Sequence, residues 1–293
     1  MAVIGAGTCI TTFAFEVGHS IDLEQCERLL SETVRQTIRP SRRAPEHFAY
    51  RPAPLRLTQD RPGAEVAGRP CASVNLVLYD FGAASVGFAF ALAGATLDEL
   101  VRLSDSLYGN AELLTEARAR IEAVLATIGP AVTRPRLAEA VEDYVVFQLE
   151  RLEPAAEAAQ LLRESGSVLA RILRAELSAL SAQEVDDALA ATLSVSPGDL
   201  AVVDWNAAIL LDPEPEDARL VLEFANVQLL ELRWLDAELD TALAQAYDTL
   251  ARSGRGGLAG FRLHAPDLDH IGELPGGRGR AVRAGDQRAE ARG

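Results

Sequence analysis

Hydrophobic residues alternate with polar ones, or form short apolar runs, in five stretches of the chain. Both patterns are typical of β-strands, and Gly, Pro, Asp and Asn mark the turns between strands. Strands are predicted over residues 8–17, 71–79, 83–92, 143–152 and 200–211. The second and third flank Asp80-Phe81-Gly82, which predicts a hairpin turn rather than the metal-binding triplet of a kinase.

Between the strands, apolar residues recur at helical spacing, and capping residues mark where helices begin. Thr96 with Glu99 and Ser181 with Glu184 have the spacing of a capping box. Further helices are predicted from Asp22, over 167–180 and after residue 211, and an Arg/Pro-rich connector is predicted over 39–56. Elements in this order predict an α+β fold, a mixed sheet with packed helices followed by a long, coiled-coil-like C-terminal helix.

The longest helical pattern follows residue 211. Asp212 is predicted to cap this helix, with Pro213 at its first position. Steps of three and four residues then define a heptad seam: Leu222, Ala225, Leu229, Leu232, Asp236, Leu239, Leu243, Ala246 and Leu250. Such a seam is typical of a coiled coil, which needs a partner helix. The residues predicted to make this contact are Leu222, Leu229, Leu232, Leu239, Leu243 and Trp234.

The chain is therefore predicted to have three parts: an α+β domain over 1–211, a heptad helix over 212–253 and a Gly/Arg-rich tail over 254–293. The tail has no apolar periodicity beyond Leu274, which is typical of disordered segments. A competing hypothesis is that the chain leaves its original reading frame near Pro275. Codons for the remaining residues, read one base later, permit an amphipathic helical sequence of the kind a returning arm requires.

The chain is acidic, with a net charge of -15 over 293 residues. An acidic surface repels phosphate backbones, so no nucleic-acid partner is predicted. The arginine-rich run over 39–43 is interpreted as a solvated connector, with a local basic patch as the alternative. The N-terminus lacks a signal-peptide pattern, and the apolar runs are shorter than the about 20 residues of a membrane-spanning helix. The predicted location is the cytoplasm, or the periphery of the inner membrane.

Residue usage excludes several catalytic classes. All 28 basic residues are arginine, whereas a Walker A loop, a protein-kinase site, a Schiff base and a Ser-Lys dyad each need a lysine. Cys9, Cys26 and Cys71 are odd in number and lack CxxC spacing, which favours reduced thiols over a disulfide framework or a zinc site. No catalytic, cofactor-binding or metal-ligating residue is predicted.

Three local clusters have a functional and a simpler interpretation. Metal-ligand residue types gather at His264, Asp267, Asp269 and His270, but this part of the tail has no pattern that would hold them in place. The carboxylates over 212–217 are explained by capping and by the helix dipole. Asp204-Trp205-Asn206 is the best candidate for a polar feature of a groove, while Trp205 and Trp234 are interpreted as core or interface aromatics.

Four segments, in their order and with the long helix at the end, carry a resemblance to a known family. They are LYDFG at 78–82, EDYVVF at 142–147, GSVLA at 166–170 and LEFANVQLLELR at 222–233. From about residue 8 to residue 250 the chain resembles the uncharacterised family of the "required for meiotic nuclear division" proteins, which has bacterial members. Phe88-Ala89 stands where that family usually has Trp-Gly.

The resemblance implies an α+β domain followed by a helical hairpin, often with a hydrophobic membrane anchor, and a supporting, non-catalytic role. The leading functional hypothesis is a non-enzymatic interaction or scaffold protein, which binds a protein partner or itself through the C-terminal helix. Membrane contact is expected only if a lost C-terminal anchor were restored. The alternative is an enzyme with an acidic or metal-assisted site that is assembled from residues distant in the sequence.

Overall fold

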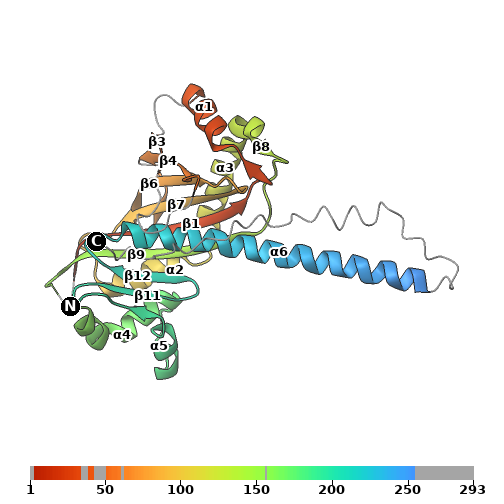
Figure 1. Ribbon diagram of the computed structural model, residues 1–293. Coiled ribbons are helices and arrows are strands. Elements are labelled where there is room, and N and C mark those ends of the chain that lie inside the picture. Colours follow the sequence, from red (N-terminus) through yellow and green to blue (C-terminus); the bar gives the residue numbers. More distant parts are fainter. Residues whose placement is uncertain (1–2, 34–38, 43–50, 61–62, 156, 255–293) are drawn as a thin grey trace, which may run out of the picture. The chain divides into compact units, whose positions relative to one another are not determined.

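The computed structural model describes residues 3–33, 39–42, 51–60, 63–155 and 157–254 (Figure 1). The chain divides into two compact units, Met1–Trp234 and Leu235–Gly293. The predicted boundary at residue 211 comes before the observed boundary between Trp234 and Leu235. The difference arises because the first part of the long helix belongs to the first unit. The tail over 255–293, the frame hypothesis and the candidate metal cluster from His264 to His270 lie outside the described residues.

Within the described residues, ten strands of the first unit form one sheet. Its main path is β10-β11-β12-β9-β1-β7-β6-β4-β3, and β5 pairs with β6. All neighbours are antiparallel except β12 and β9, which are parallel. The strands are β1 Val3–Glu16, β3 Arg39–Arg42, β4 Leu55–Asp60, β5 Glu65–Val66, β6 Arg69–Leu78, β7 Ala83–Ala91, β9 Val141–Glu153, β10 Thr192–Leu193, β11 Leu200–Val203 and β12 Ala207–Leu211.

The helices and a small second sheet complete the described structure. The α-helices are α1 Leu23–Thr33, α2 Leu97–Leu107, α3 Ala111–Ile128, α4 Ala158–Arg174, α5 Ala182–Ala188 and α6 Glu216–Gly254. A short 3₁₀ turn, Gly129–Ala131, follows α3, and β2 Ser20–Ile21 pairs with β8 Val132–Thr133. Among the described residues, no helix combines the length and the apolar character that a membrane crossing requires.

The two faces of the sheet carry different side chains, because successive residues of a strand point to opposite sides. In β1, Phe13 and Phe15 point into the main core, which also contains residues of α1 to α4. Ala14 points the other way, into a smaller cluster with Val227 and Leu230 of α6. The first-unit part of α6 therefore crosses the sheet on the face opposite to α2, α3 and α4 (Figure 1).

The α+β fold class is confirmed, and so are several local predictions. The Thr96 hydroxyl accepts a hydrogen bond from the backbone N–H of Glu99, and the Glu99 carboxylate accepts one from the backbone N–H of Thr96 at 2.8 Å. This reciprocal capping box begins α2 as expected. The Asp80-Phe81-Gly82 segment does turn the hairpin between β6 and β7, and Gly82 supplies the positive φ of 98° that the turn requires.

The predicted start of the long helix is wrong by several residues. α6 begins at Glu216, and Asp212 instead accepts a hydrogen bond from the backbone N–H of Glu214 at 2.8 Å in a turn before the helix. Pro215 explains the delay, because a proline disfavours the helical conformation in the residue before it but is tolerated in the first helical turn. Pro213, the predicted first helical residue, lies in the turn before the helix.

Three other boundaries also differ from the predictions. The strand over 200–211 is in fact β11 and β12, because Asp204 turns the chain and its N–H donates to the carbonyl of Ala207 at 2.9 Å. The helix predicted over 167–180 begins at Ala158 and ends at Arg174, where Ala175 takes a left-handed conformation. The connector over 39–56 contains β3 and the first residues of β4.

Candidate functional site

The predicted interaction residues of α6 lie on an exposed side of the helix, with one exception. In the first unit, Leu232 is 64% exposed, Leu229 is 38% exposed and Leu222 is half-buried. In the second unit, Leu239 and Leu243 are 43% and 56% exposed. We refer to these five residues as the leucine stripe. Large apolar side chains in regular register and in contact with solvent are typical of a binding surface.

A second row of residues on α6 faces the sheet. Leu220, Glu223, Val227 and Leu230 are each exposed by 5% or less. At about 100° per residue, this row lies roughly half a turn from the leucine stripe. Trp234 continues the buried row: it is half-buried, and the guanidinium carbon of Arg136 lies 5.3 Å from its ring centroid. Trp234 therefore does not lie with the leucines, with which the sequence analysis had grouped it.

A buried cluster of charges fixes the start of α6 to the sheet. The carboxylate of Glu223 lies 2.9 Å from Arg56 of β4 and 3.1 Å from Arg219, and it accepts a hydrogen bond from the hydroxyl of Ser85 at 3.1 Å. Burial alone would raise the pKa of Glu223, but the two guanidinium groups outweigh burial and hold this pKa below its usual value. The cluster is a structural anchor, because each charge in it is paired.

A carboxylate pair joins the next turns of α6 to the end of β1. Glu16 is only 3% exposed, and its Oε1 is buried without a hydrogen-bond partner. Its carboxylate lies near that of Glu231, which is half-buried. Two neighbouring carboxylates disfavour each other's charged form. Burial, the neighbouring carboxylate of Glu16 and the charge of Asp80 raise the pKa of Glu231 to about 8. Burial also raises the pKa of Glu16.

The charged groups around this pair come from three separate segments of the chain. Asp80 in the turn between β6 and β7 adds negative charge near Glu231, while Arg136 and His19 add positive charge near Glu16. A raised carboxyl pKa beside a guanidinium and an imidazole is an arrangement that acid–base sites use. Among the described residues this is the strongest candidate for a site with chemistry.

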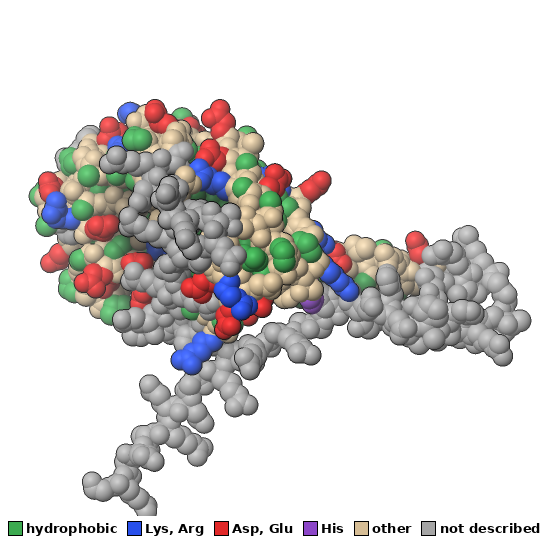
Figure 2. Space-filling model, turned by 90° about the horizontal axis from the view of Figure 1, so that it is seen from above, with side chains coloured by type: hydrophobic (Ala, Val, Ile, Leu, Met, Phe, Trp, Pro, Cys, Tyr) green, Lys and Arg blue, Asp and Glu red, His purple; other side chains and the backbone are tan. Residues whose placement is uncertain are grey.

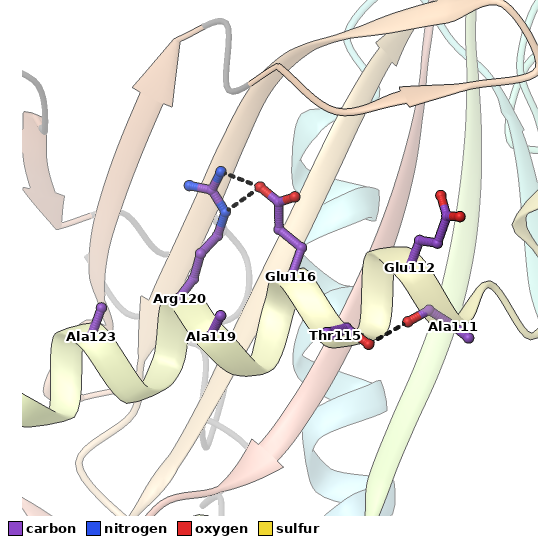
Figure 3. A pocket seen from close by; sticks show the side chains of 7 residues that line it. All are labelled: Ala111, Glu112, Thr115, Glu116, Ala119, Arg120 and Ala123. Atoms are coloured by element: carbon purple, nitrogen blue, oxygen red, sulfur yellow. Dashed lines mark hydrogen bonds and ion pairs between the residues drawn. The ribbon is translucent and has the colours of Figure 1, made fainter.

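A hollow of about 640 Å³ lies along α3 and is less informative (Figure 3). Its lining comes from one helix: Ala111, Glu112, Thr115, Glu116, Ala119, Arg120 and Ala123. The charges of Glu116 and Arg120 neutralise each other in an ion pair of 2.5 Å, and the Thr115 hydroxyl donates to its own helix at 2.7 Å. Arg120 also donates to the side chain of Gln59 on β4 at 2.5 Å. Its guanidinium is thus occupied by protein groups, and the lining does not converge on a ligand.

The Asp204-Trp205-Asn206 segment forms the tip of the β11–β12 hairpin. Asp204 pairs with Arg174 of α4 at 2.6 Å, and its carbonyl accepts a hydrogen bond from the hydroxyl of Tyr144 at 2.9 Å. Trp205 is 60% exposed and meets Tyr108 edge to face at a centroid distance of 6.2 Å. The interpretation of Trp205 as a core residue is therefore wrong, and the interface interpretation stays a prediction.

The other chemical candidates do not assemble into a site. Cys9, Cys26 and Cys71 are each buried as free thiols, and burial raises the pKa of each. Within the part of the chain that is described, no group of three or more His, Cys, Asp or Glu side chains could hold a metal ion. On the face seen in Figure 2, acidic and basic side chains are interspersed, so the described part of that face is not a continuous basic surface.

Sequence reasoning missed the carboxylate pair. Glu16 ends an apolar strand at a position that faces inward, and a charged residue at such a position was the only available signal. Glu231 follows the buried Leu230 and looks like an ordinary polar residue of a helix. Neither residue indicates the other, because 215 positions separate them and only the docking of α6 brings them together.

Comparisons with known proteins place the chain in a family without assigning an activity. Searches of the curated proteins and of the solved structures gave no significant match. A family model does match residues 6–218, which cover the sheet, α1 to α5 and the first residues of α6. The chain therefore belongs to the family of the N-terminal domain of uncharacterized protein MJ0711.

Proposed function

We propose that this chain is a non-enzymatic interaction protein that associates through the leucine stripe of α6. The observation that carries the proposal is the exposure of Leu229, Leu232, Leu239 and Leu243 at heptad positions. The buried row of the same helix already holds it on the sheet, so the stripe is not needed for docking in the first unit. Full burial of an exposed leucine side chain is worth roughly 1.5–3 kcal/mol, which makes the stripe a strong driving force for association.

The partner we propose is a second copy of this chain. A heptad stripe requires a helix with the same 3.5-residue period, and another α6 provides this period by identity. Asp236, which is exposed at a core position of the seam, sets the orientation. A parallel, in-register pair would place two Asp236 carboxylates against each other. An antiparallel pair separates them, so we propose an antiparallel arrangement of the two helices.

The test compares two double variants that add the same charge to the same helix. Leu229→Asp with Leu239→Asp places two carboxylates in the leucine stripe. Ala237→Asp with Ala244→Asp places them at exposed positions outside it. Sedimentation equilibrium of the full chain should show a dimer for wild type and for the alanine double variant. The leucine double variant should dissociate with a constant at least about a hundredfold weaker. A monomeric wild type, or equal effects of the two double variants, would refute the proposal.

The resemblance to the "required for meiotic nuclear division" proteins supports this proposal, since it implies a supporting, non-catalytic role. It also supports a place in the cytoplasm or at the periphery of the inner membrane. A soluble dimer and a membrane-peripheral dimer differ in one measurement. Flotation of the full chain with vesicles that contain anionic lipid should leave it at the bottom of the gradient if the leucine stripe is occupied by a second copy.

A second candidate function, an enzyme with an acidic site, is favoured by the pair formed by Glu16 and Glu231. A carboxyl group that keeps its proton near neutral pH is suited to general acid catalysis. A thermal-shift screen of small organic acids, sugars and nucleotides would test this function. A compound that raises the Tm of wild type but not that of Glu231→Gln would favour the enzyme, whereas equal shifts or no shift would favour the interaction protein.

A further inference from the structure

We propose that Arg233 of one copy pairs with Asp240 of the second copy, and that this contact fixes the register of the two α6 helices. This inference rests on the proposed self-association through the leucine stripe and names the residues that align it. Both residues lie on the continuous helix α6, and each directly follows a leucine of the stripe, Leu232 or Leu239. They therefore occupy the same flanking position of the heptad, which in coiled coils selects the partner and the orientation.

Positive charge is scarce along this part of α6. Arg233 is the single basic residue from Leu222 to Asp248, a segment that also has six acidic residues. Two such segments side by side repel each other unless each arginine meets a carboxylate of the other copy. Asp240 is placed to supply this carboxylate, because it is exposed and lies on the same side of the leucine stripe as Arg233.

Arg233 has room for a second carboxylate beside its contact within the chain. Its side chain is 65% exposed, and its Nη1 lies 2.6 Å from Oε1 of Glu142 on β9. A guanidinium has five N–H donors in one plane, so this ion pair uses only part of its donors. Glu142, whose side chain is 12% exposed, also holds the guanidinium in position, which reduces the entropy lost when another carboxylate binds.

The spacing of the two residues selects one antiparallel register. In an antiparallel pair, the two kinds of seam position pack against each other, so that Leu232 of one copy lies opposite Leu243 of the other in one register. Flanking residues on one side of the seam then face the same side of the other helix, and Arg233 meets Asp240 of the second copy. The twofold symmetry of such a pair forms this contact twice.

Other arrangements of the two helices lose this contact. A shift by one heptad in one direction places the two copies of Arg233 opposite each other, and the opposite shift does the same with Asp240. A parallel pair in register offers no charge pair, because Gln228 then faces Arg233 and Leu235 faces Asp240. The scarcity of positive charge thus favours the antiparallel register with Leu232 opposite Leu243.

Charge reversal in the full chain tests the contact by sedimentation equilibrium. Asp240→Arg makes an acidic helix less negative, so overall repulsion alone would tighten the dimer or leave it unchanged. The proposed contact instead sets the new guanidinium against Arg233 and should weaken the dimer at least about tenfold. Arg233→Glu together with Asp240→Arg restores opposite charges and should return the dissociation constant to within about threefold of wild type.

A matched control separates this contact from the overall charge of the helix. Ala237→Arg with Ala244→Arg adds the same charge as Asp240→Arg, but at exposed positions outside the leucine stripe. This double variant should bind as tightly as wild type or more tightly. Circular dichroism of each variant at the concentrations used for sedimentation establishes that it is folded.

Disulfide crosslinking measures the register without any change of charge. In a mixture of Leu232→Cys chains and Leu243→Cys chains, the two introduced thiols lie opposite each other, and oxidation should link unlike chains. A register shifted by one heptad would separate them by about 10 Å along the helix axis, which is beyond the reach of a disulfide. Leu229→Cys with Leu239→Cys is the control mixture, since these positions are opposite only in a shifted register. The native thiols are buried.

The outcomes distinguish this inference from the proposed function. A monomeric wild type would overturn both. A dimeric wild type that Asp240→Arg does not weaken, or whose affinity the double reversal does not restore, would overturn the register and leave self-association intact. Crosslinks in the control mixture, without crosslinks between Leu232→Cys and Leu243→Cys chains, would overturn the register as well.

Discussion

Arg56 on β4 and Glu223 on α6 lie 167 positions apart in the sequence, yet their side chains meet at 2.9 Å in the interior. Their side chains are only 13% and 4% exposed. A charge buried to this extent is stable only with its partner, because it has given up most of its hydration. The pair therefore fixes β4, which lies next to the edge strand β3, and the start of α6 in one relative position within the first unit.

Replacing Arg56 by Met should destabilise the protein by roughly 3 kcal/mol, since Glu223 would then keep only Arg219 as its counter-charge. Urea denaturation followed by circular dichroism measures this free energy of unfolding. Arg151→Met is the matched control, because Arg151 pairs with Glu153 while both side chains are more than half exposed. The control should change the free energy of unfolding by less than about 0.5 kcal/mol. Equal effects of the two variants would contradict the anchoring role.

The same cluster predicts that the stability of the protein depends on pH, because the pKa of Glu223 is shifted in the folded state. The pKa of Glu223 is held below its usual value, so its stabilising contribution is complete above the pKa of an unfolded glutamate. This contribution is lost as pH falls through the lower, folded value. The destabilisation caused by Glu223→Gln should therefore be large at pH 7 and should shrink as the pH approaches 3. A difference in unfolding free energy that is constant over this range would contradict the assignment.

Gly82 is predicted to be intolerant of any side chain. Its φ is 98°, and a Cβ built on it would lie 2.1 Å from the carbonyl oxygen of Gly18. Gly82→Ala should cost about 3 kcal/mol or more, since backbone strain and a clash with main-chain atoms add together. Gly94 is the control: its φ is 80°, but nothing lies within 4 Å of its Cβ position. Gly94→Ala should cost only about 1 kcal/mol, and thermal unfolding of the two variants measures the difference.

The fold could be predicted where local chemistry alone decides the structure. The capping box of Thr96 and Glu99 and the turn at Gly82 were readable, because each depends on residues a few positions apart. The start of α6 was misplaced because two prolines compete for the first helical turn, and the second, Pro215, prevails. The order of the strands, with β12 parallel to β9 in an otherwise antiparallel sheet, depends on long-range packing that periodicity does not record.

The candidate site depends even more strongly on long-range packing. The leucine stripe was predicted because its 3.5-residue period lies within a single helix. A second row, from Leu220 to Leu230, docks on the sheet instead. This was not predicted, because that row is also largely apolar and has the same helical period. The pair of Glu16 and Glu231 could not be found at all, because it exists only after this choice between the two faces has been made.

A final prediction compares two neighbouring leucines that lie on opposite faces of α6. Leu230 is 1% exposed in the cluster with Ala14 and Val227, whereas Leu232 is 64% exposed. Leu230→Ala should lower the free energy of unfolding by about 2–4 kcal/mol, because it leaves a cavity between helix and sheet. Leu232→Ala should change it by less than about 0.5 kcal/mol when measured on the monomer at low concentration.

The order of the two effects should reverse when self-association is measured instead of stability. By sedimentation, Leu232→Ala should weaken the dimer by about tenfold or more, since both copies lose a side chain from the interface. Leu230→Ala should leave the dissociation constant of the folded fraction unchanged. The reverse order, with Leu230 decisive for association and Leu232 decisive for stability, would mean that the helix docks on the sheet through the leucine stripe in solution.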